Sequence, residues 1–123
     1  MANSSQGLER LVKAFGYSMK GFAAGWRHEA AFRQETLLAL VLLPCAPWLA
    51  RDLFDAAVLI ASLLILLITE LFNSAIEALT DRVGTEHHEL SGRAKDLASA
   101  AVFLALVLVA VTWGALAWLR VAG

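Results

Sequence analysis

Apolar residues recur in the first part of the chain with the spacing of one face of an α-helix. Between residues 8 and 26 they follow each other at intervals of one, three or four positions, which is the helical period. The opposite face is basic and carries Arg10, Lys13 and Lys20. Such a helix lies in a membrane interface or packs on other protein, and we favour the interface. We predict a surface helix over residues 8–26. Its apolar positions are Leu8, Leu11, Val12, Phe15, Met19, Phe22, Ala23 and Trp26.

A continuous apolar run over residues 36–50, TLLALVLLPCAPWLA, predicts a first membrane-spanning helix. At 1.5 Å per residue it reaches only about 22 Å, which is short of the hydrocarbon core of about 30 Å. We therefore place the span at about residues 30–50, with the upstream turns at the interface. Pro44 and Pro47 are expected to kink or end this helix near its far end, and Trp48 lies there as an interfacial anchor would.

A second apolar run predicts another spanning helix over residues 56–80, after a short polar turn at 51–55. It starts AAVLIASLLILLIT and ends in a segment that carries several charged residues. A hydrophilic loop over residues 81–90 follows.

The last apolar run predicts a third spanning helix over residues 91–119, with Ser91 as its N-cap. Residues 97–119 hold no charged side chain, which is long enough to cross a membrane with some tilt. Trp113 and Trp118 are expected to mark its outer end.

The amino-acid composition indicates a membrane protein and argues against a soluble domain, a nucleic-acid-binding protein and a disulfide-stabilised protein. Of 123 residues, 59% are hydrophobic and 17% are charged, whereas soluble domains carry about 25% charged residues. The net charge of −1 gives no basic excess for nucleic acid. The single cysteine, Cys45, excludes a disulfide framework within the chain and is expected to be a small packed hydrophobe.

The distribution of basic residues predicts the orientation. Eight lie on one side of the predicted spans and two on the other, so the N-terminus and the loop at 81–90 should be cytoplasmic and the C-terminus outside. The eight are Arg10, Lys13, Lys20, Arg27, Arg33, Arg82, Arg93 and Lys95, and the two are Arg51 and Arg120.

A stripe of polar residues begins inside the second predicted span. With about 100° of turn per residue, five of them share one face about 100° wide: Glu70, Asn73, Ser74, Glu77 and Asp81. Carboxylates at membrane depth are costly and usually functional. A purely structural polar seam is the alternative.

The depth of the two glutamates suggests separate roles. If Ala56 lies at the outer boundary, Glu70 is about 21 Å inward and Glu77 about 32 Å. Glu70 would then lie just beneath the cytoplasmic headgroups, where it suits a general base. Glu77, at the water boundary, is placed to hold Mg²⁺ against phosphates. Glu29 either completes a divalent-metal site or is a solvated charge.

Known metal and nucleotide motifs do not account for this pattern. HEAAF lacks the second histidine of a zincin, because Phe32 stands there. GYSMKG begins with the spacing of a P-loop, but Phe22 replaces the required lysine. His87 and His88 are neighbours in EHHEL and are expected in a surface loop near the nucleotide rather than in a metal site of their own. Any ATP site in this chain is of an unfamiliar kind.

Three long segments carry a resemblance to a known family: EAAFRQE at 29–35, ELFNSAIEALTDRVG at 70–84 and HELSGRAKD at 88–96. With these segments, the chain closely resembles the small integral-membrane diacylglycerol kinases of bacteria over nearly its full length. The resemblance implies an all-α homotrimer in the inner membrane, with active sites shared between subunits. It also implies transfer of the γ-phosphate of MgATP to the hydroxyl of diacylglycerol, which gives phosphatidic acid for phospholipid recycling.

The resemblance also implies roles for individual residues. The catalytic set is Glu70 as the base with Asn73, Lys95 and Asp96. Glu29 and Glu77 bind the metal ion. The ATP-binding set is Arg10, Tyr17, Glu29, Glu77, Glu86, His87, His88, Lys95 and Asp96. The lipid-substrate set is Arg10, Ala31, Phe32, Arg33, Gln34, Glu35, Trp48, Glu70, Ser99 and Trp113.

The chain departs from the family pattern at a few positions and leaves rival functions open. Met19 stands where tryptophan is expected, and His87 replaces a tyrosine of the nucleotide loop. An undecaprenol kinase of the same fold would differ only in its lipid pocket. A proton-coupled transporter would use Glu70 as an intramembrane carrier, and a non-catalytic scaffold would have no use for the polar stripe.

Overall fold

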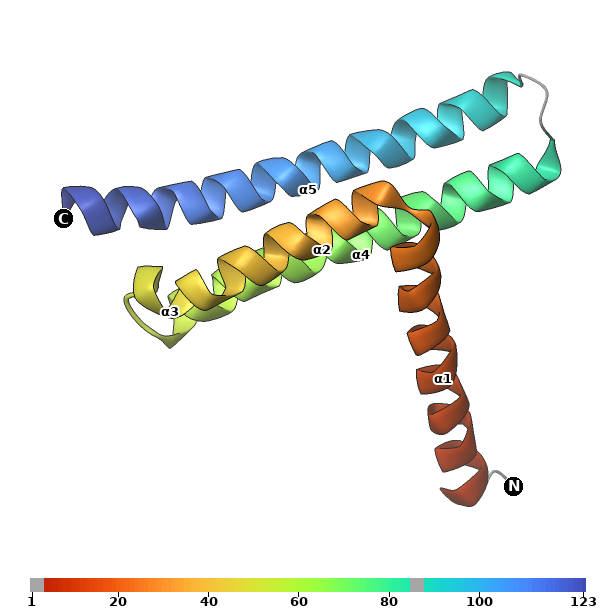
Figure 1. The fold of residues 1–123 in the computed structure, drawn as a ribbon, viewed down its shortest axis with the longest axis horizontal. Helices are drawn as coiled ribbons and strands as arrows, with labels where there is room; N and C mark the ends of the chain where they lie inside the picture. The colour runs from red at the N-terminus through yellow and green to blue at the C-terminus, as the bar shows by residue number, and fades with distance from the viewer. Residues whose placement is uncertain (1–3, 85–87) are drawn as a thin grey trace.

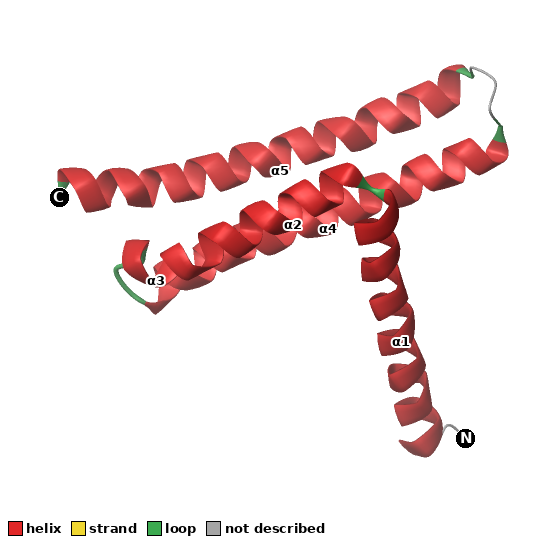
Figure 2. Ribbon diagram, in the orientation of Figure 1, coloured by secondary structure: helices red, strands yellow, loops and turns green. Residues whose placement is uncertain are grey.

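The computed structural model describes residues 4–84 and 88–123, and this part of the chain is helical without any strand (Figures 1 and 2). α4 and α5 run antiparallel and side by side, α2 lies along α4, and α1 points away from the other helices. The elements are α1 (Ser4–His28), α2 (Ala30–Leu42), the 3₁₀ turn η1 (Leu43–Cys45), α3 (Ala46–Leu49), α4 (Leu53–Val83) and α5 (Glu89–Ala122).

The N-terminal helix α1 covers the predicted surface helix and extends past it at both ends. Its apolar face is exposed along almost its whole length. Among the residues of α1 whose burial the structure describes, Gly25 alone is buried. A Cβ on Gly25 would lie 3.0 Å from Cδ2 of Phe32 and 3.4 Å from Cδ2 of Leu71. Glycine therefore permits the last turn of α1 to approach α2 and α4 closely.

The segment predicted as the first span, residues 30–50, consists of three consecutive helical elements: α2, the 3₁₀ turn η1 and α3. Pro44 has no backbone N–H to continue the helix, and the chain changes from α2 to the 3₁₀ turn η1 around it. The short helix α3 then begins with Pro47 in its first turn and ends at Leu49. The expected break is present at Pro44, whereas Pro47 begins the next short helix rather than ending one. Ala46 and Leu49 remain buried against the neighbouring helices.

The helices α4 and α5 contain the predicted second and third spans, and both are long and apolar enough to cross a membrane. They have 31 and 34 residues, which is about 46 and 51 Å at 1.5 Å per residue. Both exceed a hydrocarbon core of about 30 Å. Their shared core draws on Leu59, Leu63 and Leu66 of α4 and on Ala105, Val109, Trp113 and Leu116 of α5.

The loop between α4 and α5 is shorter than the predicted 81–90. α4 continues to Val83 and α5 begins at Glu89. The Nδ1 atom of His88 accepts a hydrogen bond from the backbone N–H of Leu90 at 3.0 Å, so His88 is the N-cap and Ser91 is not. Charged and polar residues at the ends of α4 and α5 also form backbone hydrogen bonds along the helix, although they are not hydrophobic. The prediction from hydropathy therefore made both helices too short.

A network of hydrogen bonds defines the turn at the opposite end of α4. The Oδ1 atom of Asp52 accepts from the backbone N–H of Asp55 at 2.9 Å and caps the helix. Asp55 in turn accepts at Oδ2 from the backbone N–H of Arg51 at 3.0 Å and from its Nε at 2.7 Å. The hydrogen bond to Asp55, together with its charge, raises the pKa of the Arg51 guanidinium, so Arg51 stays charged.

Removal of this cap gives a first testable prediction. Asp52→Ala should lower the free energy of unfolding by about 1 kcal/mol, because the first turn of α4 loses a side-chain acceptor. The measurement is the thermal unfolding of the protein in detergent. Asp52→Asn keeps an oxygen acceptor and should lose much less, so equal losses in the two variants would contradict the capping role.

Candidate active site

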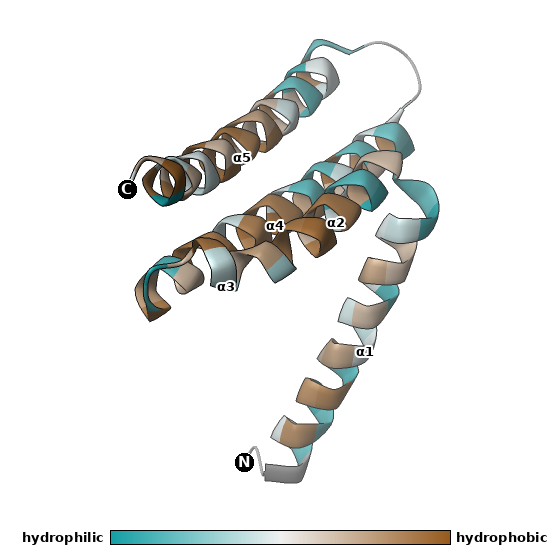
Figure 3. Ribbon diagram, turned by 60° about the vertical axis from the view of Figure 1, so that its left-hand side comes forward, coloured by the Kyte–Doolittle hydropathy of each residue, from teal (hydrophilic) through white to brown (hydrophobic). Residues whose placement is uncertain are grey.

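Polar residues gather at the end of the molecule where α4 and α5 are connected, and at the junction of α1 with α2 (Figure 3). The middle of the helices is apolar in the same view. The polar stripe predicted on α4 starts where this change occurs.

Glu70 is the most enclosed ionisable side chain of this region. It is 2% exposed, and its Oε2 atom has no hydrogen-bond partner. The charges of Glu35, Glu77 and Glu29 act on it. No lysine, arginine or histidine forms an ion pair with any of these four carboxylates in the described part of the chain. These four carboxylates therefore lack a direct ion-pair partner, although no three acidic, histidine or cysteine side chains of the described chain converge into a metal-binding group.

These four carboxylates come from three segments that packing brings together. Glu29 is the single residue between α1 and α2, Glu35 lies on α2, and Glu70 and Glu77 lie two turns apart on α4. The Nδ2 atom of Asn73 donates to Oε2 of Glu77 at 3.3 Å, while Oε2 of the buried Glu70 has no hydrogen-bond partner. Asn73, which lies between the two glutamates along α4, therefore holds the half-buried Glu77.

Four buried oxygens around this cluster lack a hydrogen-bond partner in the described structure: Oε2 of Glu70, Oδ1 of Asn73, Oγ of Ser74 and Oγ1 of Thr36. Most buried polar groups in proteins are paired, so unpaired ones need an explanation. One explanation is a bound ligand whose hydrogen-bonding groups pair with these four oxygens. Thr36 was not predicted, since it belongs to an apolar run and carries no motif.

A pocket of about 560 Å³ lies between α1 and α4 beside this cluster. Glu29 and His28 line it from the α1–α2 junction and Ser74 from α4. Gly21, Ala24, Gly25, Ala75 and Ala78 form much of its wall. The small residues on α1 and α4 make room for this pocket, and the side chains of Glu29 and Ser74 contribute polar atoms to its wall.

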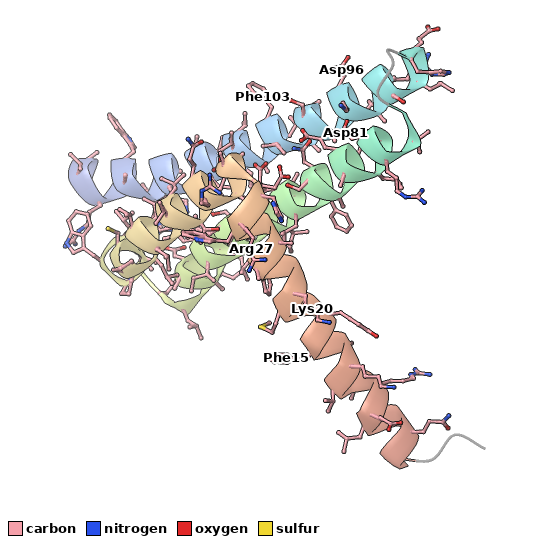
Figure 4. The ribbon with its side chains drawn as sticks, turned by 45° about the vertical axis from the view of Figure 1, so that its right-hand side comes forward. Phe15, Lys20, Arg27, Asp81, Asp96 and Phe103 are labelled. Atoms are coloured by element: carbon pink, nitrogen blue, oxygen red, sulfur yellow. The ribbon has the colours of Figure 1, made fainter. Side chains whose placement is uncertain are left out.

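Lys95 is paired differently from the sequence-based expectation. Its Nζ atom lies 2.7 Å from Oδ1 of Asp81, which joins α5 to α4. Asp81 and Asp96 lie at the same end of α4 and α5 (Figure 4). Sequence reasoning placed Asp81 on the polar stripe but missed it as the partner of Lys95, because the register between two helices is not visible in either one alone.

The structure leaves several other predicted nucleotide residues apart from this cluster. Arg10 and Tyr17 are exposed on α1, where Nζ of Lys20 lies 5.9 Å from the centre of the Tyr17 ring. His88 is exposed and caps α5. Glu86 and His87 lie outside the described residues.

The predicted lipid residues divide into two groups. Near the cluster, Phe32 is buried, and Nη1 of Arg33 donates to the carbonyl of Trp26 at 2.7 Å. Ala31, Gln34 and Ser99 are exposed.

Trp48 and Trp113 form the second group, towards the other end of the bundle. The Nε1 atom of Trp113 donates to Oγ of Ser62 at 3.0 Å, and the side chain is 7% exposed. Ser62 precedes Glu70 by eight residues, or about 12 Å along the helix. Trp113 is thus packed on α4 rather than exposed as an outer anchor, which corrects that expectation. Trp48 lies under the guanidinium of Arg120, 4.6 Å from its ring centre.

Comparison with known proteins places the chain in a family. The family model for prokaryotic diacylglycerol kinase matches residues 16–117. A diacylglycerol kinase of Escherichia coli (strain K12) is 50% identical over 118 residues, which cover 96% of this chain and 97% of that protein. A diacylglycerol kinase of Pseudomonas aeruginosa is 53% identical over 107 residues, or 87% of each chain. One from Haemophilus influenzae is 44% identical over 108 residues, or 88% of this chain and 92% of that protein. The chain belongs to the prokaryotic diacylglycerol kinase family.

Proposed function

We propose that the chain is a membrane lipid kinase that transfers the γ-phosphate of MgATP to the hydroxyl of diacylglycerol and forms phosphatidic acid for phospholipid recycling. The observation that carries this proposal is Glu70, a buried carboxylate with an unpartnered oxygen where the polar stripe meets the apolar part of α4. The names of the relatives in the family support the choice of lipid.

In this proposal Glu70 is the general base. The lipid hydroxyl gives its proton to Glu70 while its oxygen forms a bond to the γ-phosphorus. The bond from that phosphorus to the bridging oxygen of ADP breaks, and ADP leaves with the electron pair. Phosphoryl transfer requires positioning and charge neutralisation more than covalent catalysis, and a base in reach of the hydroxyl supplies the proton transfer.

Glu29 and Glu77 are the residues that would hold Mg²⁺. Both are half-buried, neither forms an ion pair within 4 Å with a cation in the described chain, and both act electrostatically on Glu70. Mg²⁺ is usually held by one or two carboxylates together with substrate phosphates, which fits this pair. When bound, the ion would neutralise charge on the phosphates. The two carboxylates would hold it from the α1–α2 junction and from α4.

The remaining predicted residues are assigned to the nucleotide and to the reacting phosphate. Lys95, Asp96 and His88 lie at the N-terminal end of α5, with Glu86 and His87 nearby in sequence. Arg10 and Tyr17 lie on α1, apart from the carboxylate cluster, and would contact the nucleotide from there. Lys95 would exchange its ion pair with Asp81 for phosphate oxygens. Such a change costs little, because exposed ion pairs contribute roughly 0–1 kcal/mol.

We further propose three spans per chain, with the N-terminus and the α4–α5 loop in the cytoplasm of a bacterial inner membrane. The apolar face of α1 would then rest on the lipid interface. Large apolar side chains remain exposed on α4 and α5, including Phe72, Phe103 and Leu104, as lipid- or subunit-facing helices require. A homotrimer with shared sites would enclose the pocket beside Glu29, which one chain leaves open to one side.

A second prediction tests the metal site. Glu77→Gln should raise the Mg²⁺ concentration needed for half-maximal activity by about 10–100-fold, comparable to the loss when a metal site is disturbed. The measurement is a Mg²⁺ titration of activity at saturating ATP. Glu89→Gln, at an exposed glutamate in the first turn of α5, is the control and should leave the Mg²⁺ midpoint in place. An unchanged midpoint in Glu77→Gln would contradict the assignment.

The activity itself is tested with labelled ATP and purified protein in mixed micelles that contain diacylglycerol, undecaprenol or no added lipid. Labelled phosphatidic acid is the expected product. Label found only on undecaprenol would preserve the mechanism but change the substrate. No labelled lipid from a well-folded protein would overturn the kinase proposal and favour a transporter.

A further inference from the structure

The ion pair between Lys95 and Asp81 joins two different long helices. Nζ of Lys95 on α5 lies 2.7 Å from Oδ1 of Asp81 on α4, and the two side chains are 44% and 65% exposed. The other ion pairs in the described parts of the chain each join residues four positions apart. Because an ion pair this exposed stabilises a protein little, the apolar core rather than this pair holds α4 against α5. A bracing role therefore does not account for it.

Two carboxylates on one face of α4 are within reach of this lysine. Asp81 follows Glu77 by four residues, which is about 40° of rotation and about 6 Å along the helix. The charges of both act on Lys95, yet within the described chain only Asp81 forms an ion pair with it. Glu77 accepts a hydrogen bond from Asn73 instead. The long and flexible lysine stem thus ends at the exposed carboxylate and not at the half-buried one.

The two carboxylates differ in what an ion pair with Lys95 would do to the site. A pair with Glu77 would occupy the carboxylate that is proposed to hold Mg²⁺. Because Glu77 is half-buried, water and salt would screen that pair less than they screen the pair with Asp81, and phosphates would displace it less easily. The pair with Asp81 leaves Glu77 free, and it is weak enough for phosphate oxygens to replace.

We infer that Asp81 retains Lys95 at a distance from Glu77 while no nucleotide is bound, and thereby keeps that carboxylate available to the metal ion. The inference rests on the proposed function, to which the roles of Glu77 and Lys95 belong. Asp81 is a positioning residue, since it contacts Lys95 rather than the metal ion or the reacting phosphate. Lys95 moves to the phosphates when nucleotide binds, and Asp81 accepts it again when the nucleotide leaves.

The first test is a crystal structure of Asp81→Asn without nucleotide or metal, beside one of the unchanged protein. Asparagine keeps the shape of the side chain but has no charge to hold the ammonium group. We expect Nζ of Lys95 to lie within about 4 Å of a carboxylate oxygen of Glu77 in the variant, which is the distance of an ion pair, and at Asp81 in the unchanged protein. A lysine that stays away from Glu77 in the variant would overturn the inference. This readout does not depend on kinase activity.

The Mg²⁺ titration described for Glu77→Gln supplies the second test. In Asp81→Asn the Mg²⁺ midpoint should rise by about two- to fivefold, which is the range that the strength of such an ion pair allows. At saturating Mg²⁺ the kcat should equal that of the unchanged protein, because the metal then displaces the lysine from Glu77. Asp81→Glu keeps a carboxylate for Lys95 and should restore the original midpoint, and Glu89→Gln should not change it.

Three outcomes of these measurements would contradict the role of Asp81. An unchanged midpoint in Asp81→Asn would show that Lys95 does not compete for Glu77. A loss of kcat that excess Mg²⁺ does not restore would show that Asp81 acts in the reaction itself. A raised midpoint with Lys95 distant from Glu77 in the crystal would show that Asp81 acts only through its charge. No phosphorylation of lipid by the unchanged protein would instead overturn the proposed function on which the inference rests.

Discussion

Replacing Glu70 by glutamine is expected to reduce kcat by about 10²–10⁴-fold, which is the usual contribution of a positioned general base. Glutamine has nearly the same shape and fits the site that encloses Glu70, but it accepts no proton from the lipid hydroxyl. Because the variant also removes a charge from a cluster of four carboxylates, it should unfold at the same temperature as the unchanged protein or higher. The measurement is phosphate transfer to diacylglycerol at saturating substrates, together with thermal unfolding.

Glu89→Gln is a suitable control, because Glu89 is an exposed glutamate at the start of α5 whose contact with Arg93 is long, at 3.8 Å. It should retain full activity. A folded Glu70→Gln protein with more than about a tenth of the original kcat would rule out Glu70 as the base, since general-base catalysis contributes far more than that. A transporter or scaffold would have no kinase activity to lose.

Replacing Trp113 by alanine should have the largest effect on stability. The side chain is 7% exposed and packed among α4 and α5, and its Nε1 atom donates to Ser62. Truncation of a buried aromatic residue leaves a cavity and costs about 3–5 kcal/mol. Loss of the donor adds less, since hydrogen bonds within membranes contribute about 0.6 kcal/mol on average. The measurement is thermal unfolding in detergent.

Trp118→Ala supplies the matched control on the same helix, because Trp118 is 71% exposed. It should change the unfolding temperature very little. If Trp113 acts instead by lining the lipid site, Trp113→Ala would raise KM for the lipid while the unfolding temperature stays constant. That result would contradict the packing role described for it.

Long apolar runs and, for α1, the helical spacing of apolar residues were enough to predict which segments are helical. A run of apolar side chains requires a helix in a membrane, because every backbone polar group must be satisfied within the segment. The same signal could not give the helix ends. α4 and α5 continue into water through charged residues such as Arg82 and Glu89, where hydropathy no longer distinguishes helix from loop.

The carboxylates of the candidate site were also identifiable, since Glu70 and Glu77 are anomalous within an apolar segment. What the sequence could not give is the packing between helices. The pairing of Lys95 with Asp81, the burial of Trp113 against Ser62 and the free hydroxyl of Thr36 all depend on how α2 and α5 are rotated about α4. The spacing of residues within one helix does not show how that helix is rotated about its neighbour.

The exposed helix α1 has a consequence for backbone exchange. Among the residues of α1 whose burial the structure describes, Gly25 in the last turn is the one buried against other helices, so the chain itself gives most amides of α1 little tertiary protection. Amides in such segments exchange with solvent through low-energy local opening, whereas the amides of α4 and α5 exchange only through larger openings. Hydrogen–deuterium exchange of α1 would therefore report contact with a lipid surface directly, with α4 as the internal reference: slow exchange on bilayers and fast exchange in a solubilised form.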